Sequence, residues 1–247
     1  MRQDRFPEMD DDSLEQRLAP LLAAARLEDA PWLRKLLTDR EVAKAFGALD
    51  SELFVRGALP AHAVAVTSAA RAEGRTTLAL VLAAMTAAFD RTKRVLLVDG
   101  DIENGRLGAM FQLGSEAAGL ADLFAGRAGP AQIIHASALA NLSVAPSARP
   151  GTKVLGFAPK PFEGFLEEAR SRFDLVVVDT PAGSASKAAF SIAKLVGHAI
   201  LVVRYAGPTR EQVGTFLADL ERAGAEVIGC VMNRREYAIP SIFYGHR

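Results

Sequence analysis

Six short runs of mainly apolar residues constrain the fold of this chain more than any other feature. They lie at residues 62–67, 94–99, 142–145, 174–180, 199–203 and 226–232. Runs of this kind, rich in valine, leucine and isoleucine, are typical of strands buried on both faces of a mainly parallel sheet. The segments 78–89, 162–169 and 213–220 between them carry apolar side chains at helical spacing. This alternation predicts an α/β fold in which helices cover both faces of the sheet.

The first 57 residues have a different pattern. Leucines recur at helical spacing over residues 14–22, Pro31 can open a second short helix, and a third helical stretch covers residues 41–55. No strand signal precedes residue 60. The sequence therefore predicts a helical N-terminal extension over residues 1–57 and a main domain over residues 58–247.

Charge and hydrophobicity exclude several classes of partner. Lysine plus arginine and aspartate plus glutamate both number 29, so there is no net field to attract nucleic acid or an anionic membrane. No apolar stretch is long enough to span a bilayer, and the polar, acidic start does not resemble a signal peptide. The single cysteine, Cys230, lies in an apolar run, which predicts a buried core residue in a reducing compartment. We expect a cytoplasmic protein with no direct membrane insertion and no nucleic-acid partner.

The turn after the first predicted strand is a candidate anion site. It reads Ser-Ala-Ala-Arg-Ala-Glu-Gly-Arg-Thr-Thr over residues 68–77 and leads into a strong helix. Unpaired backbone N–H groups and the helix dipole converge at such a turn. Arg75 adds a positive charge, and Thr76 has a hydroxyl suited to Mg²⁺. The formal phosphate-loop motif is not met, because Ala69 replaces its first glycine and Arg75 its lysine, so an ordinary strand-to-helix turn remains an alternative.

Carboxylates follow two of the predicted strands. Asp99 and Asp101 end one strand, and Asp179 ends another. Such carboxylates would repel one another unless a cation or hydrogen-bond donors stood between them. Mg²⁺ beside a nucleotide's phosphates would meet that need, and the alternative is that each aspartate caps the next helix.

With these segments placed, the chain resembles the cytoplasmic domain of bacterial tyrosine kinases, the partners of polysaccharide co-polymerases, within the P-loop superfamily of MinD and ParA that has a deviant Walker A motif. The resemblance covers roughly residues 41–235. It is carried by VTSAARAEGRTTLALVLA, VLLVDGD, GLADLFAG, LSVAPSA, FDLVVVDTPAG, LVVRYAGPTREQV and VIGCVMN, taken in that order.

The resemblance implies a P-loop nucleotide-binding domain that takes ATP or ADP with Mg²⁺. It implies a phosphate-binding set made of Arg71, Ala72, Glu73, Gly74, Arg75, Thr76 and Thr77. It places Thr76, Asp101 and Asp179 on the metal and makes Asp99, Asp101 and Arg75 the catalytic candidates. Asn233 would contact adenine, although asparagine is also an ordinary turn residue after a strand.

Several of the family's residues are replaced. Ala72 stands where the family has glycine, so we expect it to reach a positive φ only with difficulty. Arg71 occupies the family's proline position, which is also that of the signature lysine of MinD and ParA. Arg75 keeps the lysine's charge in a larger planar fork, which should weaken ATP binding without abolishing it.

The residues that assemble the kinases into a ring are also replaced. Their Glu-x-x-Arg-x-x-Arg motif reads Lys44, Gly47 and Asp50 here, so the ring is not expected, while a dimer remains open. The tail RREYAIPSIFYGHR has Tyr237 and Tyr244 as its candidate phosphate acceptors. Without the ring, the tail of one subunit would not be positioned to receive phosphate from another subunit.

Three hypotheses follow. We favour a nucleotide-binding regulator of exopolysaccharide synthesis or export with weak or lost kinase activity, recruited to the inner membrane by a membrane polysaccharide co-polymerase or export protein. The first alternative is an active tyrosine autokinase or ATPase. The second is a positioning ATPase of the MinD/ParA type.

Overall fold

The computed structural model describes residues 11–24, 31–50, 62–148, 152 and 156–233. The strands are β1 Ala63–Thr67, β2 Val95–Asp99, β3 His135–Ala136, β4 Leu142–Ala145, β5 Leu175–Asp179, β6 His198–Arg204 and β7 Glu226–Asn233. The helices are α1 Asp11–Ala24, α2 Pro31–Leu37, α3 Arg40–Asp50, α4 Arg75–Phe89, α5 Leu107–Met110, α6 Leu120–Phe124, α7 Pro159–Arg172, α8 Ala188–Val196 and α9 Arg210–Ala223, with a 3₁₀ turn at Pro130–Ile133.

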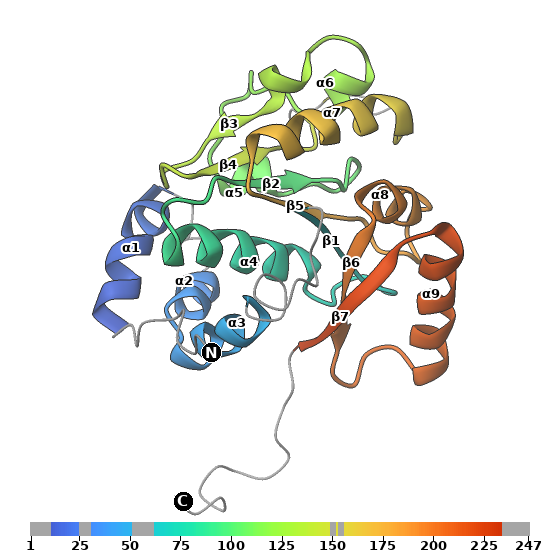
Figure 1. The fold of residues 1–247 in the computed structure, drawn as a ribbon, viewed down its shortest axis with the longest axis horizontal. Coiled ribbons are helices and arrows are strands. Elements are labelled where there is room, and N and C mark those ends of the chain that lie inside the picture. Colours follow the sequence, from blue (N-terminus) through green and yellow to red (C-terminus); the bar gives the residue numbers. More distant parts are fainter. Residues whose placement is uncertain (1–10, 25–30, 51–61, 149–151, 153–155, 234–247) are drawn as a thin grey trace, which may run out of the picture.

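The strands form one sheet in the order β3-β4-β2-β5-β1-β6-β7 (Figure 1). All neighbouring pairs are parallel except β3–β4, which is antiparallel at one edge. β1 lies between β5 and β6, so the turn that follows it opens at the centre of the sheet. The α/β prediction is confirmed, and each of the six predicted strands is present.

Alternate side chains along each central strand enter two separate hydrophobic cores. Val64 and Val66 of β1 pack with α4 and with leucines of α1 and α2, whereas Ala63 and Ala65 face α7, α8 and α9. Burial on both faces explains why these strands read as unbroken apolar runs. Figure 1 shows α4 and α1–α3 on one side of the sheet and α7–α9 on the other. Among the described residues, no helix is long and apolar enough to cross a membrane.

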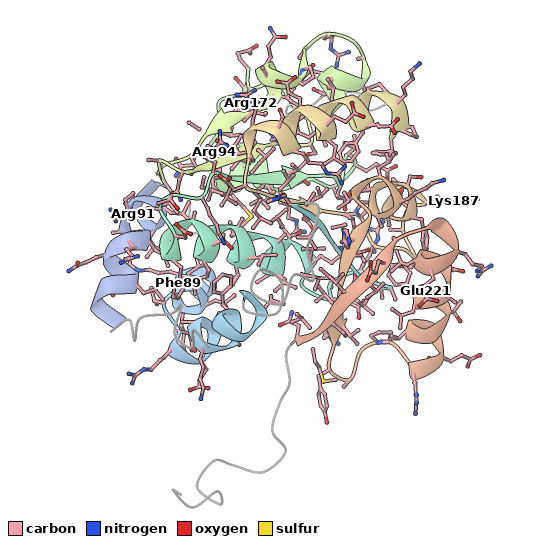
Figure 2. The ribbon with its side chains drawn as sticks, in the orientation of Figure 1. Phe89, Arg91, Arg94, Arg172, Lys187 and Glu221 are labelled. Carbon is pink, nitrogen blue, oxygen red and sulfur yellow. The ribbon has the colours of Figure 1, made fainter. Side chains whose placement is uncertain are left out.

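The N-terminal helices pack against α4, the helix that follows the turn at residues 68–74. Arg17 of α1 donates from Nη1 to the carbonyl of Ala88 at 3.1 Å, which satisfies an acceptor in the last turn of α4. Phe46 of α3 stacks on Phe89, with ring centroids 5.4 Å apart. Figure 2 shows Phe89 at the end of α4 that lies beside α1 and α2. The three predicted N-terminal helices are confirmed as far as residue 50, and the expected boundary at residue 57 lies outside the described residues.

Two features depart from the predictions. The strand β3 and the short helices α5 and α6 were not predicted, because each is too short to show a period, and the nine-residue helix α8 was not predicted either. Cys230 is exposed, contrary to the expectation of a core residue. The physical reason is that β7 is the last strand of the sheet and its side chains are mostly half-buried or exposed.

Candidate functional site

The site is built where β1, β2, β5 and β7 end. In a parallel sheet these carboxyl ends meet at one edge, where ligands bind in open α/β folds. The turn after β1 leads through Gly74, which has φ 101°, into α4. A side chain at Gly74 would also collide with the carboxamide of Asn233. Glycine is therefore required at residue 74 by its backbone angle and by the close approach of β7.

Glu73 holds this turn in place. Its side chain is only 2% exposed. One carboxylate oxygen accepts from the backbone N–H of Ala70 at 2.8 Å, and the other accepts from the N–H of Arg204 at 3.2 Å. Asn233 Nδ2 donates to the Glu73 carbonyl at 2.8 Å. Glu73 and Asn233 were predicted to contact phosphate and adenine, and what the structure shows is that they tie the turn to β6 and β7.

Arg75 lies within the turn and does not extend into solvent. Its Nη1 donates to Ser68 Oγ at 3.0 Å, and Ser68 Oγ donates to the Ala70 carbonyl at 2.7 Å. Its Nε is buried without a hydrogen-bond partner. Burial lowers the pKa of Arg75, and the negative charges of Asp179 and Asp101 oppose that shift. A positive group therefore sits in a desolvated position next to the predicted phosphate site.

Ala72 adopts the backbone conformation that we expected alanine to reach with difficulty. Its φ is 60°, in the left-handed region, although its side chain is exposed. A left-handed alanine costs about 1–2 kcal/mol relative to the right-handed conformation. The turn keeps its shape despite the missing glycine, and it stores this strain in the backbone.

Asp99 and Asp179 face one another from adjacent strands. They are direct partners in the register of β2 and β5. Thr76 Oγ1 donates to Asp179 Oδ2 at 2.6 Å, and the Leu107 N–H donates to Asp99 Oδ2 at 3.0 Å. The Oδ1 atoms of both aspartates are buried without a hydrogen-bond partner. Thr76 and Asp179 of the predicted metal set are therefore in contact, and the catalytic candidate Asp99 lies opposite Asp179.

Burial changes the acidity of both carboxyls. Desolvation raises the pKa of Asp99 to about 7, against the opposing hydrogen bond from Leu107. Desolvation and the neighbouring Asp99 raise the pKa of Asp179 to about 8. Near neutral pH the carboxyls of Asp99 and Asp179 therefore retain protons unless an added positive charge stabilises their ionised forms.

Asp101 is placed differently. Its Oδ1 accepts from the backbone N–H of Asn104 at 3.1 Å, so it closes the turn after β2. Its charge is among the influences that raise the pKa of Asp99 and Asp179. The described part of the chain contains no group of three or more histidine, cysteine, aspartate or glutamate side chains arranged to hold a metal ion.

The oxygen atoms at this edge nevertheless fit a small divalent cation. Two buried carboxylate oxygens lack partners, and a threonine hydroxyl lies against one of these carboxylates. Mg²⁺ prefers oxygen ligands, and it is commonly held by one or two carboxylates together with waters and phosphate oxygens. A full protein cage is not required, so the residues present are compatible with such an ion.

The remaining predicted residues are spread around this centre. Arg71 is exposed at the tip of the turn, and Thr77 is half-buried in the first turn of α4. On α3, Lys44 is exposed and Gly47 is half-buried. Tyr237 and Tyr244, together with the side chain of Asp50, lie outside the described residues.

Sequence reasoning missed three contributors to the site. Ser68 receives the Arg75 guanidinium, and Leu107 supplies the N–H that binds Asp99. Gly105 leaves room for Asp99, because a Cβ there would lie 2.6 Å from Asp99 Oδ2 and would also collide with Ser147. Ser68 is the first residue of the turn that carries the motif, so its position in the sequence could have identified it. Leu107 and Gly105 act through their backbone positions, which no local sequence pattern marks.

The buried carboxyls predict a pH-dependent stability in the absence of cation. Their folded pKa values lie above about 3.9, the value of an unfolded aspartate, so the folded state binds more protons. Its stability should therefore fall as pH rises from about 4 through about 8. Asp179→Asn should flatten that fall, and the exposed Glu163→Gln should leave it unchanged. Urea unfolding with a chelator present checks this, and equal slopes in all three proteins would contradict it.

The left-handed Ala72 predicts a stabilising substitution. Ala72→Gly should raise the free energy of unfolding by about 1 kcal/mol, because glycine adopts positive φ without steric cost. Ala70→Gly is the matched control in the same turn, since Ala70 is not among the positive-φ residues. There glycine should lower stability by about 0.5–1 kcal/mol. Chemical unfolding measures both, and a loss of stability in Ala72→Gly would disprove the strain.

Comparisons with known proteins identify relatives of this chain. No family model matches the chain. The tyrosine-protein kinase Wzc of Salmonella typhi is 32% identical over 162 residues, which is 62% of this chain and 21% of that protein. The chain thus aligns with about a fifth of that relative's length.

Solved structures show the same relationship. The kinase domain of the Escherichia coli tyrosine kinase Etk is 26% identical and superposes with a TM-score of 0.67, covering 81% of this chain and 79% of that domain. MinD of Pyrococcus horikoshii, solved with Mg-ADP, is 23% identical with a TM-score of 0.60, covering 74% and 75%. The chain is therefore a homologue of the bacterial tyrosine kinases, related to their kinase domain, and it shares its fold with MinD.

Proposed function

We propose that the chain binds ATP or ADP at residues 68–77 and regulates exopolysaccharide synthesis or export, with weak or lost tyrosine-kinase activity. The observation that carries nucleotide binding is the placement of Arg75 inside the turn, within electrostatic reach of the buried Asp179, whose partner on the adjacent strand is Asp99. A positive group, helix α4's N-terminus and acidic side chains converge there. This combination suits phosphate oxygens accompanied by a metal ion.

Thr76, Asp101 and Asp179 are the residues that would hold Mg²⁺. The ion would supply positive charge to the phosphates. Thr76 already points its hydroxyl at Asp179, so a small rearrangement would let both oxygens face a cation. Asp99 lies across from Asp179 and is the candidate acceptor for a proton from an attacking hydroxyl.

Replacements in two places, the turn and α3, support weakened catalysis. Arg75 is engaged with Ser68, and its planar fork differs in reach and geometry from the lysine of the kinases. On α3, Lys44 and Gly47 stand where the kinases carry ring-forming charges, which argues against a ring and leaves a dimer open. Tyr237 and Tyr244 remain the candidate acceptors if any transfer occurs.

The proposed partner is a membrane polysaccharide co-polymerase or export protein, which would bring an otherwise cytoplasmic chain to the inner membrane. The proposal rests on the relationship to Wzc and on the absence of a spanning helix from the described residues. Co-purification from a membrane fraction tests it directly. Recovery of no envelope protein from that fraction would count against it.

An active autokinase is the second candidate. It is favoured by the retained pairing of Asp99 with Asp179 and by the Thr76 hydroxyl beside them. A positioning ATPase of the MinD/ParA type has less support, because Arg71 stands at the signature lysine and is exposed at the tip of the turn.

Restoring the lysine should strengthen nucleotide binding. Arg75→Lys should tighten Mg-ADP binding by roughly ten- to a hundredfold, because one charge-assisted hydrogen bond is worth about 1.5–3 kcal/mol. Arg91→Lys is the matched control, since Arg91 lies beyond the other end of α4 (Figure 2). Isothermal titration calorimetry measures both. Binding that is equally weak in all three proteins would remove Arg75 as the limiting residue.

Kinase activity is tested separately from binding. If the favoured function holds, purified protein with ATP and Mg²⁺ should incorporate little or no phosphotyrosine, measured by mass spectrometry of residues 234–247. Robust incorporation that disappears in Asp99→Asn would support the autokinase instead. Binding without incorporation would favour the regulatory function.

A further inference from the structure

The edge strand β7 is the longest strand of the sheet, with eight residues, and among the described residues only β6 pairs with it (Figure 1). The outer side of an edge strand presents backbone N–H and C=O groups that can pair with another strand. Proteins commonly protect such an edge with lysine, with proline or by keeping the strand short. β7 contains neither lysine nor proline, and its one charged residue, Glu226, lies at its start.

The second half of β7 is the regular part of this edge. The register of β6 and β7 shifts once, between Ala199 and Ile200, and residues 229–233 then pair one by one with residues 200–204. A β-bulge increases the local twist and turns an edge away from a partner strand. Because the shift lies near the start of β7, residues 229–233 keep the geometry that strand pairing requires.

Exposed apolar side chains gather at this end of the edge. Met232 is 57% exposed and Tyr205, which directly follows β6, is 47% exposed, and they are the two large hydrophobic side chains exposed among the described residues. The Tyr205 N–H donates to the Asn233 carbonyl at 2.8 Å, so both side chains belong to the same corner of the sheet. Cys230 is exposed as well. Single exposed apolar residues are normal, whereas a cluster of them indicates an interaction surface.

A second copy of the chain fits this edge, because β7 complements itself. In an antiparallel pairing centred on Val231, Cys230 of each copy lies opposite Met232 of the other. Directly opposed residues share one face of a sheet, and both of these side chains are exposed. Two-fold symmetry forms the contact twice. Each copy would therefore cover the exposed side chains of the other.

The charges at the two ends of β7 favour the same antiparallel arrangement. The start carries Glu226, whose side chain is 74% exposed beside His198, and the sequence continues past Asn233 with Arg234 and Arg235. Antiparallel pairing brings the acidic start of each strand towards the basic continuation of the other, whereas parallel pairing brings like charges together. The chain is formally neutral, so two copies do not repel one another through their net charge.

We propose that β7 is a dimerisation edge, at which two copies of this chain pair antiparallel about Val231 and join their sheets into one. The inference does not rest on nucleotide binding, and it concerns a surface that the proposed function leaves unassigned. Asn233, which ends β7, also donates to the Glu73 carbonyl, so the interface adjoins the phosphate turn.

A charge placed on the edge tests this interface. Met232→Lys should weaken the dimer by about a hundredfold, because lysine protects an edge and symmetry removes the buried methionine twice. Ala218→Lys adds the same charge at an exposed position on α9 and should leave the dimer unchanged. Sedimentation equilibrium of the full chain measures both, and circular dichroism checks that each variant is folded. A monomeric wild type, or equal dissociation constants in all three proteins, would overturn the dimerisation edge.

The single cysteine provides a second test that leaves the edge unaltered. Pairing centred on Val231 makes the two Cys230 residues diagonal neighbours, about 7–8 Å apart, so a short bis-maleimide should link the wild-type chain into a covalent dimer. In the double variant Cys230→Ser with Ala218→Cys, the thiol lies on α9 and the same reagent should leave monomer. Equal cross-linking of both proteins, or none of the wild type, would contradict the pairing.

Hydrogen exchange at the backbone amides of β7 distinguishes other occupants of the edge. Slow exchange in the dimer, becoming faster in Met232→Lys, supports pairing with a second copy. A monomer with slow exchange would mean that the chain's own residues cover the edge. A monomer with fast exchange would leave the edge to an extended segment of another protein. Either monomer result overturns the second copy as the occupant.

Discussion

The parallel pairing of β1 between β5 and β6 is the constraint on which the rest of this structure depends. It delivers the ends of β1, β2, β5 and β7 to a single edge, so residues far apart in sequence meet there. Glu73 accepts an N–H from Arg204, and Thr76 donates to Asp179, only because these strands run in the same direction in this order. The cores above and below supply the burial that holds the strands in register.

That same burial makes the ionised form of the two site carboxyls electrostatically unfavourable. Asp99 and Asp179 are brought into a nearly solvent-free position, and each keeps one oxygen without a hydrogen-bond partner. Unpaired buried polar atoms are unfavourable, so an apolar pair would stabilise the ligand-free fold better. Their presence at strand ends beside Arg75, with pKa values raised to about 7 and about 8, is typical of a site arranged for a charged ligand.

Much of this arrangement could be predicted from the sequence, for a physical reason. Strands buried on both faces and amphipathic helices leave strong periodic patterns, which locate β1, β2, β5, α4 and the aspartates that follow the strands. The inward direction of Glu73 leaves no such mark, and neither does the link between Arg75 and Ser68. Side-chain hydrogen bonds between distant segments depend on tertiary distances, which a single sequence does not encode locally. Cys230 was misplaced for a related reason: an apolar run does not reveal that its strand lies at the edge of the sheet.

The replacement of lysine by Arg75 has different consequences for binding and for catalysis. Its guanidinium donates to a neutral serine hydroxyl, so only the donor of this hydrogen bond carries a charge. A phosphate could displace that partner, because its oxygens carry the opposite charge and can accept two parallel hydrogen bonds from a guanidinium. Phosphoryl transfer is more demanding, since it depends on positioning the reacting groups, and a misplacement of about 1 Å can cost about a hundredfold in rate. A planar fork anchored inside the turn is therefore compatible with a retained phosphate site and a slow chemical step, the combination that suits a nucleotide-dependent regulator.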